Sequence, residues 1–155
     1  MSISMVTNRT QEDYETAKLL RLKLQTGVTL TDNEKQAFER GSCTTTMLNR
    51  IENAQKELAT RLNSYGIPIS ISNVTTWSYA RLYYGNYSER VINNLKTLLS
   101  KVYKQYEMPK VPNEFLSIKN ANDFEKLHEN IEIRLDETSK NFKVCGQYTC
   151  GGGIF

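Results

Sequence analysis

Few residues of this chain carry side chains that could do chemistry. Its single histidine, His128, follows Leu127 at the edge of an apolar stripe, with acidic neighbours and no nucleophile at a fixed spacing. We interpret it as a surface or boundary residue and keep a small enzyme around Trp77 and His128 as an alternative. Motifs for phosphate binding, for a catalytic zinc ion and for a nucleophilic serine do not occur in the sequence. We therefore predict no catalytic residues.

The three cysteines offer too few ligands for an intrachain metal site, because a structural zinc site needs four. Four residues separate Cys145 from Cys150, and the other candidate ligands are Cys43 and His128. The pair could form a disulfide across a tight hairpin, or remain as reduced thiols that behave like small apolar side chains. We expect neither a metal nor another cofactor.

Composition indicates a folded protein without an obvious nucleic-acid or membrane partner. The chain has 155 residues, 39% hydrophobic and 24% charged, with a net charge of +3. Acidic and basic residues are interspersed along each predicted helix, which is typical of a solvated surface rather than of a nucleic-acid-binding face. No apolar run is long enough to span a bilayer, and no signal-peptide pattern begins the chain. We expect a protein made in a cytoplasm.

Helical spacing of apolar residues dominates from residue 10 to residue 140. Capping-box patterns begin helices at Thr10 and Thr31, and Gly27 and Gly41 end them. Longer apolar stripes predict three further helices, at about residues 44–65, 88–106 and 121–139. We predict an all-α fold, a four- to five-helix bundle with modest loops.

The segments outside these helices have different characters. Residues 1–9 predict an extended N-terminal arm before the helical domain of residues 10–140. Alternating isoleucines in residues 67–71 predict a short extended stretch across the helices. The aromatic cluster at residues 77–87 is interpreted as a cap on the open end of the bundle, with a stacking platform for sugars or bases as the alternative.

The last fifteen residues, 141–155, are predicted to be a β-prone C-terminal docking tail. From Val144 onward they are uncharged, rich in glycine, β-branched and aromatic residues, and they repeat apolar groups about every five residues. A strand-prone segment presents unpaired backbone donors and acceptors that another chain can pair. The predicted contact residues of this tail are Val144, Cys145, Tyr148, Cys150, Ile154 and Phe155.

Residues 34–61 suggest a second class of function. They have a helix–glycine–helix layout, as in a helix-turn-helix DNA-binding regulator. The fit is partial, because Arg50 falls where an inward apolar residue is expected and Glu52 and Glu57 would repel phosphate. A helical hairpin without a DNA role is the favoured interpretation.

Short motifs in a fixed order give the most specific signal. Residues 7–13 read Thr-Asn-Arg-Thr-Gln-Glu-Asp, residues 48–53 read Leu-Asn-Arg-Ile-Glu-Asn, and residues 121–125 read Ala-Asn-Asp-Phe-Glu. Between them come a Tyr-Gly pair at 65–66, Trp77 and two prolines, Pro109 and Pro112. This order resembles a family of small structural proteins from the tail and baseplate region of bacteriophages, prophages and phage tail-like particles of Gram-positive (Firmicutes) bacteria.

The resemblance implies a virion protein of the tail or baseplate, assembled in the host bacterial cytoplasm, without an enzymatic role. Its partners would be other tail or baseplate proteins and further copies of itself, as a homo-oligomer or in ring-symmetric positions. Two departures stand out: residues 27–41 lack the tryptophan of the family, and cysteine and glycine replace serine and acids near the end.

Arg9 and Arg50 are predicted as the anchors of the arm. Both belong to motifs that a helical core does not need, and guanidinium groups can form several hydrogen bonds at once. Two alternatives stay open: they tie the arm to the third helix within one molecule, or they hold it on a neighbouring subunit.

Overall fold

The computed structural model describes residues 3–74, 77, 87–102, 108–113 and 117–145, with the side chains of 87–88 and 141–145 excepted. All regular structure within these residues is helical. The helices are α1 (Gln11–Gln25), α2 (Asp32–Gly41), α3 (Thr45–Ser64), α5 (Tyr87–Leu99) and α6 (Ile118–Cys145). The prediction of an all-α fold is confirmed.

Side-chain caps and glycines set the helix ends near the positions predicted. Thr10 and Thr31 each close a capping box, and the Thr44 hydroxyl accepts a hydrogen bond from the Met47 amide at the start of α3. Gly27 and Gly66 follow α1 and α3 with φ of 80° and 76°, a conformation that costs little only for glycine.

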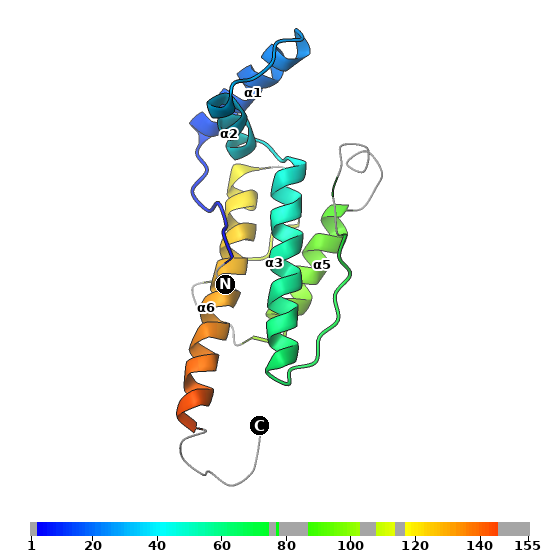
Figure 1. The fold of residues 1–155 in the computed structure, drawn as a ribbon, viewed down its shortest axis with the longest axis vertical. Coiled ribbons are helices and arrows are strands. Elements are labelled where there is room, and N and C mark those ends of the chain that lie inside the picture. Colours follow the sequence, from blue (N-terminus) through cyan, green and yellow to red (C-terminus); the bar gives the residue numbers. More distant parts are fainter. Residues whose placement is uncertain (1–2, 75–76, 78–86, 103–107, 114–116, 146–155) are drawn as a thin grey trace.

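Three helices, α3, α5 and α6, contact one another and enclose the main hydrophobic core (Figure 1). The predicted apolar stripes face this core. Its most buried members are Met47, Ile51, Leu58, Leu62, Val91, Leu95, Leu98, Phe124, Leu127, Ile131 and Leu135.

The other two helices, α1 and α2, pack on each other as a hairpin that projects beyond the ends of α3 and α6 (Figure 1). The two backbones lie close together at Gly41, where an added Cβ would lie 1.9 Å from the carbonyl oxygen of Asp13. The five helices thus form a three-helix core and a projecting hairpin, and the predicted four- to five-helix bundle is not confirmed.

The N-terminal arm lies along α6, in the opposite direction. The backbone amides of Ile3 and Val6 donate to the carboxylates of Glu132 and Glu125, at 2.9 and 2.5 Å. Three residues of extended chain span about 10 Å, which matches seven residues of helix at about 1.5 Å each. This match explains why the arm meets acidic side chains two turns apart on α6.

The segment after α3 also packs on the core without forming a strand. Ile67, Ile69 and Ile71 are half-buried against it. Asn63 fixes the turn, because its side-chain amide bonds both the N–H and the C=O of Ile69 at 3.0 Å. The segment is therefore non-helical and packs on the core at the three predicted isoleucines.

The last helix is longer than predicted. α6 starts at Ile118 and continues to Cys145, whereas the apolar stripe predicted about 121–139. No glycine or proline interrupts residues 118–145, so the helix can run until Gly146. The first residues of the predicted β-prone tail, 141–145, are thus helical, which corrects the start of that tail. Residues 146–155 lie outside the described part of the chain.

The close contact at Gly41 gives the first prediction. Gly41→Ala should lower the free energy of unfolding of the hairpin by about 1–3 kcal/mol, because overpacking separates two helix backbones. Gly27→Ala is the matched control: nothing lies within 4 Å of the new Cβ, and only the positive φ is penalised. Amide hydrogen exchange of α1 and α2 measures both. Equal protection of α1 in the Gly41 variant and the native chain would contradict the packing described.

Candidate functional site

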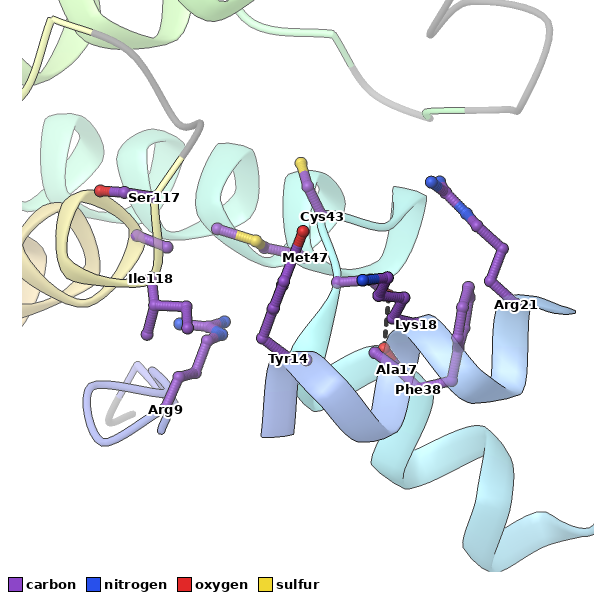
Figure 2. Close-up of a pocket in the computed structure, with 13 residues that line it drawn as sticks. Arg9, Tyr14, Ala17, Lys18, Arg21, Phe38, Cys43, Met47, Ser117 and Ile118 are labelled. Atoms are coloured by element: carbon purple, nitrogen blue, oxygen red, sulfur yellow. Dashed lines mark hydrogen bonds between the residues drawn. The ribbon is translucent and has the colours of Figure 1, made fainter. Parts of the chain in front are cut away.

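A cavity of about 340 Å³ lies where the hairpin meets the ends of α3 and α6, and we call it the hairpin pocket (Figure 2). Residues from the arm, both hairpin helices, the α2–α3 link and the first turns of α3 and α6 line it. They are Arg9, Tyr14, Ala17, Lys18, Arg21, Phe38, Gly41, Ser42, Cys43, Met47, Ser117, Ile118 and Ala121.

The walls of the hairpin pocket combine apolar groups with positive charge. Figure 2 shows Tyr14 between the Arg9 side of the pocket and Met47 of α3, with Ile118 at the start of α6. Lys18 and Arg21 occupy the next turns of α1 and are exposed. No acidic residue is among the described lining residues. The pocket therefore fits an apolar segment that carries hydrogen-bond acceptors and no positive charge.

Cys43 lies in the link between α2 and α3, where it is exposed to solvent and lines the hairpin pocket. Desolvation by the surrounding wall raises the pKa of its thiol, and the nearby positive charge of Arg9 opposes this only in part. At neutral pH the group is a thiol rather than a thiolate, so it contributes a small apolar surface.

Below the hairpin pocket, Glu125 of α6 is completely buried and holds two guanidinium groups. Its Oε1 lies 2.5 Å from Nη2 of Arg9 and 2.9 Å from Nη2 of Arg50. Its other oxygen accepts the Val6 amide, and Asn122 bonds both the N–H and the C=O of Arg9 at 3.1 and 2.9 Å. We call these residues the Glu125 network.

The two predicted anchors, Arg9 and Arg50, thus meet on one carboxylate of their own chain. This arrangement resembles the intramolecular alternative, with one difference. The arm bonds α6 directly and is connected to α3 only through Glu125, which Arg50 also bonds. Arg9 also donates from Nε to the carbonyl of Arg40, at 3.0 Å, so it connects the arm to the hairpin. The guanidinium of Arg50 is partly exposed, with a side-chain accessibility of 26%.

None of the predicted tail residues contacts the hairpin pocket or the Glu125 network in the part of the chain that the structure describes. Val144 and Cys145 lie in the last turn of α6, and their side chains are outside the description. Tyr148, Cys150, Ile154 and Phe155 lie outside the described residues altogether.

A second buried carboxylate, Glu52 of α3, connects this helix to α5 and to residues 74 and 77. It pairs with Arg90 of α5, accepts the indole N–H of Trp77 at 3.2 Å and accepts the Val74 amide at 3.2 Å. Asn49 accepts the Trp77 amide at 2.7 Å. We call these residues the Glu52 network; it fixes the chain after residue 72 to α3 and α5.

The expectation of a surface or boundary position for His128 is wrong: the ring is completely buried. Its Nδ1 lies 2.8 Å from the carbonyl of Phe124 and its Nε2 lies 3.2 Å from Nε2 of Gln55. These contacts are consistent with a neutral ring that donates from Nδ1 and accepts at Nε2. Desolvation lowers the pKa of His128 to about 4, although the Phe124 carbonyl and Glu125 favour the charged form.

Gln55 extends this contact into a buried chain of polar groups. Its amide also donates to the Val91 carbonyl at 2.9 Å, and its oxygen accepts from Asn94 at 3.1 Å. Asn94 in turn bonds the backbone of Ser72. The chain connects α6, α3, α5 and the segment after α3, and it gives the buried side chains of His128, Gln55 and Asn94 hydrogen-bond partners in the low-dielectric core.

Sequence reasoning did not identify Glu125, Asn122, Asn94 or Gln55 as a site, although a signal for two of them was present. Glu125 and Asn122 belong to the motif at 121–125, which contributed to the resemblance but was given no physical role. An acid at an otherwise apolar helix position, together with two arginines in other motifs, could have indicated a buried pair.

Among the described residues, no group of three or more histidine, cysteine or acidic side chains is placed to hold a metal ion. None of the described helices is both long enough and apolar enough to cross a membrane. Comparisons with family models, with curated proteins and with solved structures gave no match.

The Glu125 network gives the second prediction. Glu125→Gln should lower the free energy of unfolding by about 3 kcal/mol, because it leaves the buried Arg9 without its counter-charge. Glu137→Gln on the same helix is the control, since Glu137 is half exposed and its pair with Arg134 should contribute less than about 1 kcal/mol. Chemical denaturation followed by circular dichroism compares the two. A loss no larger than that of the control would contradict the role of Glu125.

The burial of His128 gives the third prediction. Its folded-state pKa, about 4, is below the ordinary 6.5 that we expect in the unfolded chain. Its contribution to stability is therefore complete above about pH 6.5 and is lost as pH falls towards 4, by on the order of 3 kcal/mol. Because His128 is the single histidine, its ring proton resonances report the pKa directly by NMR.

The control for this titration is His128→Gln, whose side chain stays neutral over the same range. Carboxylates also titrate below about pH 5, so the quantity to follow is the difference in unfolding free energy between the native chain and the variant. We expect the native chain to lose stability relative to the variant as pH falls. A ring that titrates near 6.5 in the folded protein would contradict the burial described.

Proposed function

We propose that this chain is a non-enzymatic structural subunit of a phage-type tail, baseplate or tail-like bacteriocin particle, which acts by docking to neighbouring proteins. In this proposal the three-helix core is a rigid body. The hairpin and the residues after α6 supply contacts at its two ends, and repeated copies multiply weak contacts in the particle.

The observation that carries this proposal is the position of the exposed apolar side chains. Five of the six large hydrophobic residues exposed in the described chain belong to α1 or to the loop after it. Leu19 and Leu22, three residues apart, are neighbours on the surface of α1, and adjacent exposed apolar groups are typical of protein–protein contacts. The five are Tyr14, Leu19, Leu22, Leu24 and Val28, with exposed fractions of 43–67%.

The resemblance to phage tail and baseplate proteins adds support of a different kind. Its three motifs are far apart in the sequence, yet one arginine or acid from each of them meets in the Glu125 network. The motifs are thus parts of one structural unit that holds the arm and the core together. Motif residues that hold the chain together, rather than bind a substrate, are consistent with a structural protein.

The burial of α3 makes the DNA-binding alternative less favourable. A recognition helix must present one face to the major groove. The side of α3 that faces the core includes nine buried residues. Its exposed residues carry a single positive charge; they are Thr46, Asn53, Lys56, Thr60, Asn63 and Ser64. No observation in the described chain favours the alternative.

The fourth prediction tests the docking role of the hairpin. The double variant Leu19→Glu with Leu22→Glu should fold normally, because both side chains are already exposed at 67% and 54%. It should be lost from particles purified from the producing bacterium, since two buried charges oppose an apolar contact. Immunoblots of density-gradient fractions measure incorporation.

Ile133→Glu is the matched control, because Ile133 is 50% exposed on α6, away from the hairpin. It should co-migrate with particles as the native chain does. If the native chain itself fails to co-migrate with any particle, the proposed function is wrong. If the hairpin variant incorporates normally, the hairpin is not the docking surface.

A further inference from the structure

We propose that the hairpin pocket receives the C-terminal segment, residues 146–155, of a second copy of this chain. The inference rests on the proposed role of that segment in docking, and it names the receiving site and the partner. The pocket is lined by the hairpin and the first turn of α6, whereas the C-terminal segment follows the last turn of that helix, at its other end (Figure 1). Such a contact is head-to-tail, and its repetition produces a ring or a filament.

The chemistry of the pocket fits this segment. The apolar wall of Tyr14, Phe38 and Met47 can cover side chains such as Ile154 and Phe155. Lys18 and Arg21 can donate to backbone carbonyl groups of an extended segment. Residues 144–155 carry no lysine or arginine, so they bring no like charge against this basic rim, whereas the rest of the chain has 20 basic residues.

Distance excludes the same segment of the same chain. Ile118 lines the pocket and Cys145 ends α6, and the 27 helical steps between them span about 40 Å. Ten residues of fully extended chain reach at most about 36 Å, and these ten must first reverse direction. The walls formed by Ala17 and Phe38 lie farther still, on the hairpin. Only another molecule can bring its segment there.

The fifth prediction follows. The purified chain should self-associate with increasing concentration in sedimentation velocity experiments. A chain that ends at Cys145 and the variant Cys43→Trp should associate about tenfold or more weakly. The truncation removes the segment. The tryptophan fills the pocket, because Cys43 lines it, and the substitution should leave the fold intact because this position is exposed. Cys43→Ser is the matched control, because it leaves the pocket open, and circular dichroism verifies that all variants fold.

Photo-crosslinking identifies the contact itself. Phe155→p-benzoylphenylalanine places a light-activated ketone at the end of the segment, and mixing with ¹⁵N-labelled native chain distinguishes contacts between copies from contacts within one. We expect crosslinks between copies, to peptides from α1, α2 or the α2–α3 link. A monomer at every concentration, association that Cys43→Trp leaves unchanged, or crosslinks confined to one chain would each overturn the inference.

These outcomes are separable from a failure of the proposed function. A chain that enters particles but does not self-associate retains the structural role and refutes the head-to-tail contact. A chain that self-associates through the pocket but never enters a particle has the contact and lacks the role.

Discussion

The structure depends on a carboxylate, Glu125, that has no contact with water. Moving such a charge out of solvent costs several kcal/mol, and this cost is offset only if nearly all of its hydrogen-bonding capacity is used. Here two guanidinium groups and a backbone amide share its two oxygens. These three partners come from the arm and from α3, so the arm, α3 and α6 are held together by one group. Arg50 remains partly exposed, which lets solvent stabilise the excess positive charge.

The remaining polar contacts of the core follow the same rule. The buried Glu52 carboxylate bonds Arg90 and the Trp77 indole. The buried His128 ring bonds Gln55 and the Phe124 carbonyl. Hydrophobic burial alone would allow the three core helices to slide or rotate, since apolar contacts are not directional. Directional bonds between helices select one register. We infer that these polar groups contribute more to the uniqueness of the fold than to its net stability, as buried polar residues do in some helical proteins.

The parts of the fold that were predicted from the sequence are those with local causes. Capping residues such as Thr10 and Thr31 act within three residues, and an apolar stripe with a period of 3.6 identifies its own helix. The parts that were missed are set by partners far along the chain. Arg9 bonds Asn122 across 113 residues, and the burial of His128 depends on Gln55, 73 residues away. The amino-acid composition changes near residue 141, and this change predicted the end of the last helix there. A helix continues, however, as long as no glycine or proline interrupts it, so α6 extends to Cys145. The hairpin pocket was not predicted either, because its lining comes from the arm, both hairpin helices, the α2–α3 link and the first turns of α3 and α6.

Arg9 connects this internal framework to the surface proposed for docking. The same guanidinium that neutralises Glu125 donates to the Arg40 carbonyl and forms part of the pocket wall. The hairpin is thereby fixed to the core at its base, where Arg40 also pairs with Asp13, while its distal end makes few contacts with the rest of the molecule. A segment bound in the pocket would contact the junction between hairpin and core, which these bonds hold in place, rather than a hairpin that moves freely. Because less conformational entropy is lost when a preformed site is filled, this rigidity favours docking of a short apolar segment. The charges that stabilise the fold thus also preorganise the surface on which we expect assembly to depend.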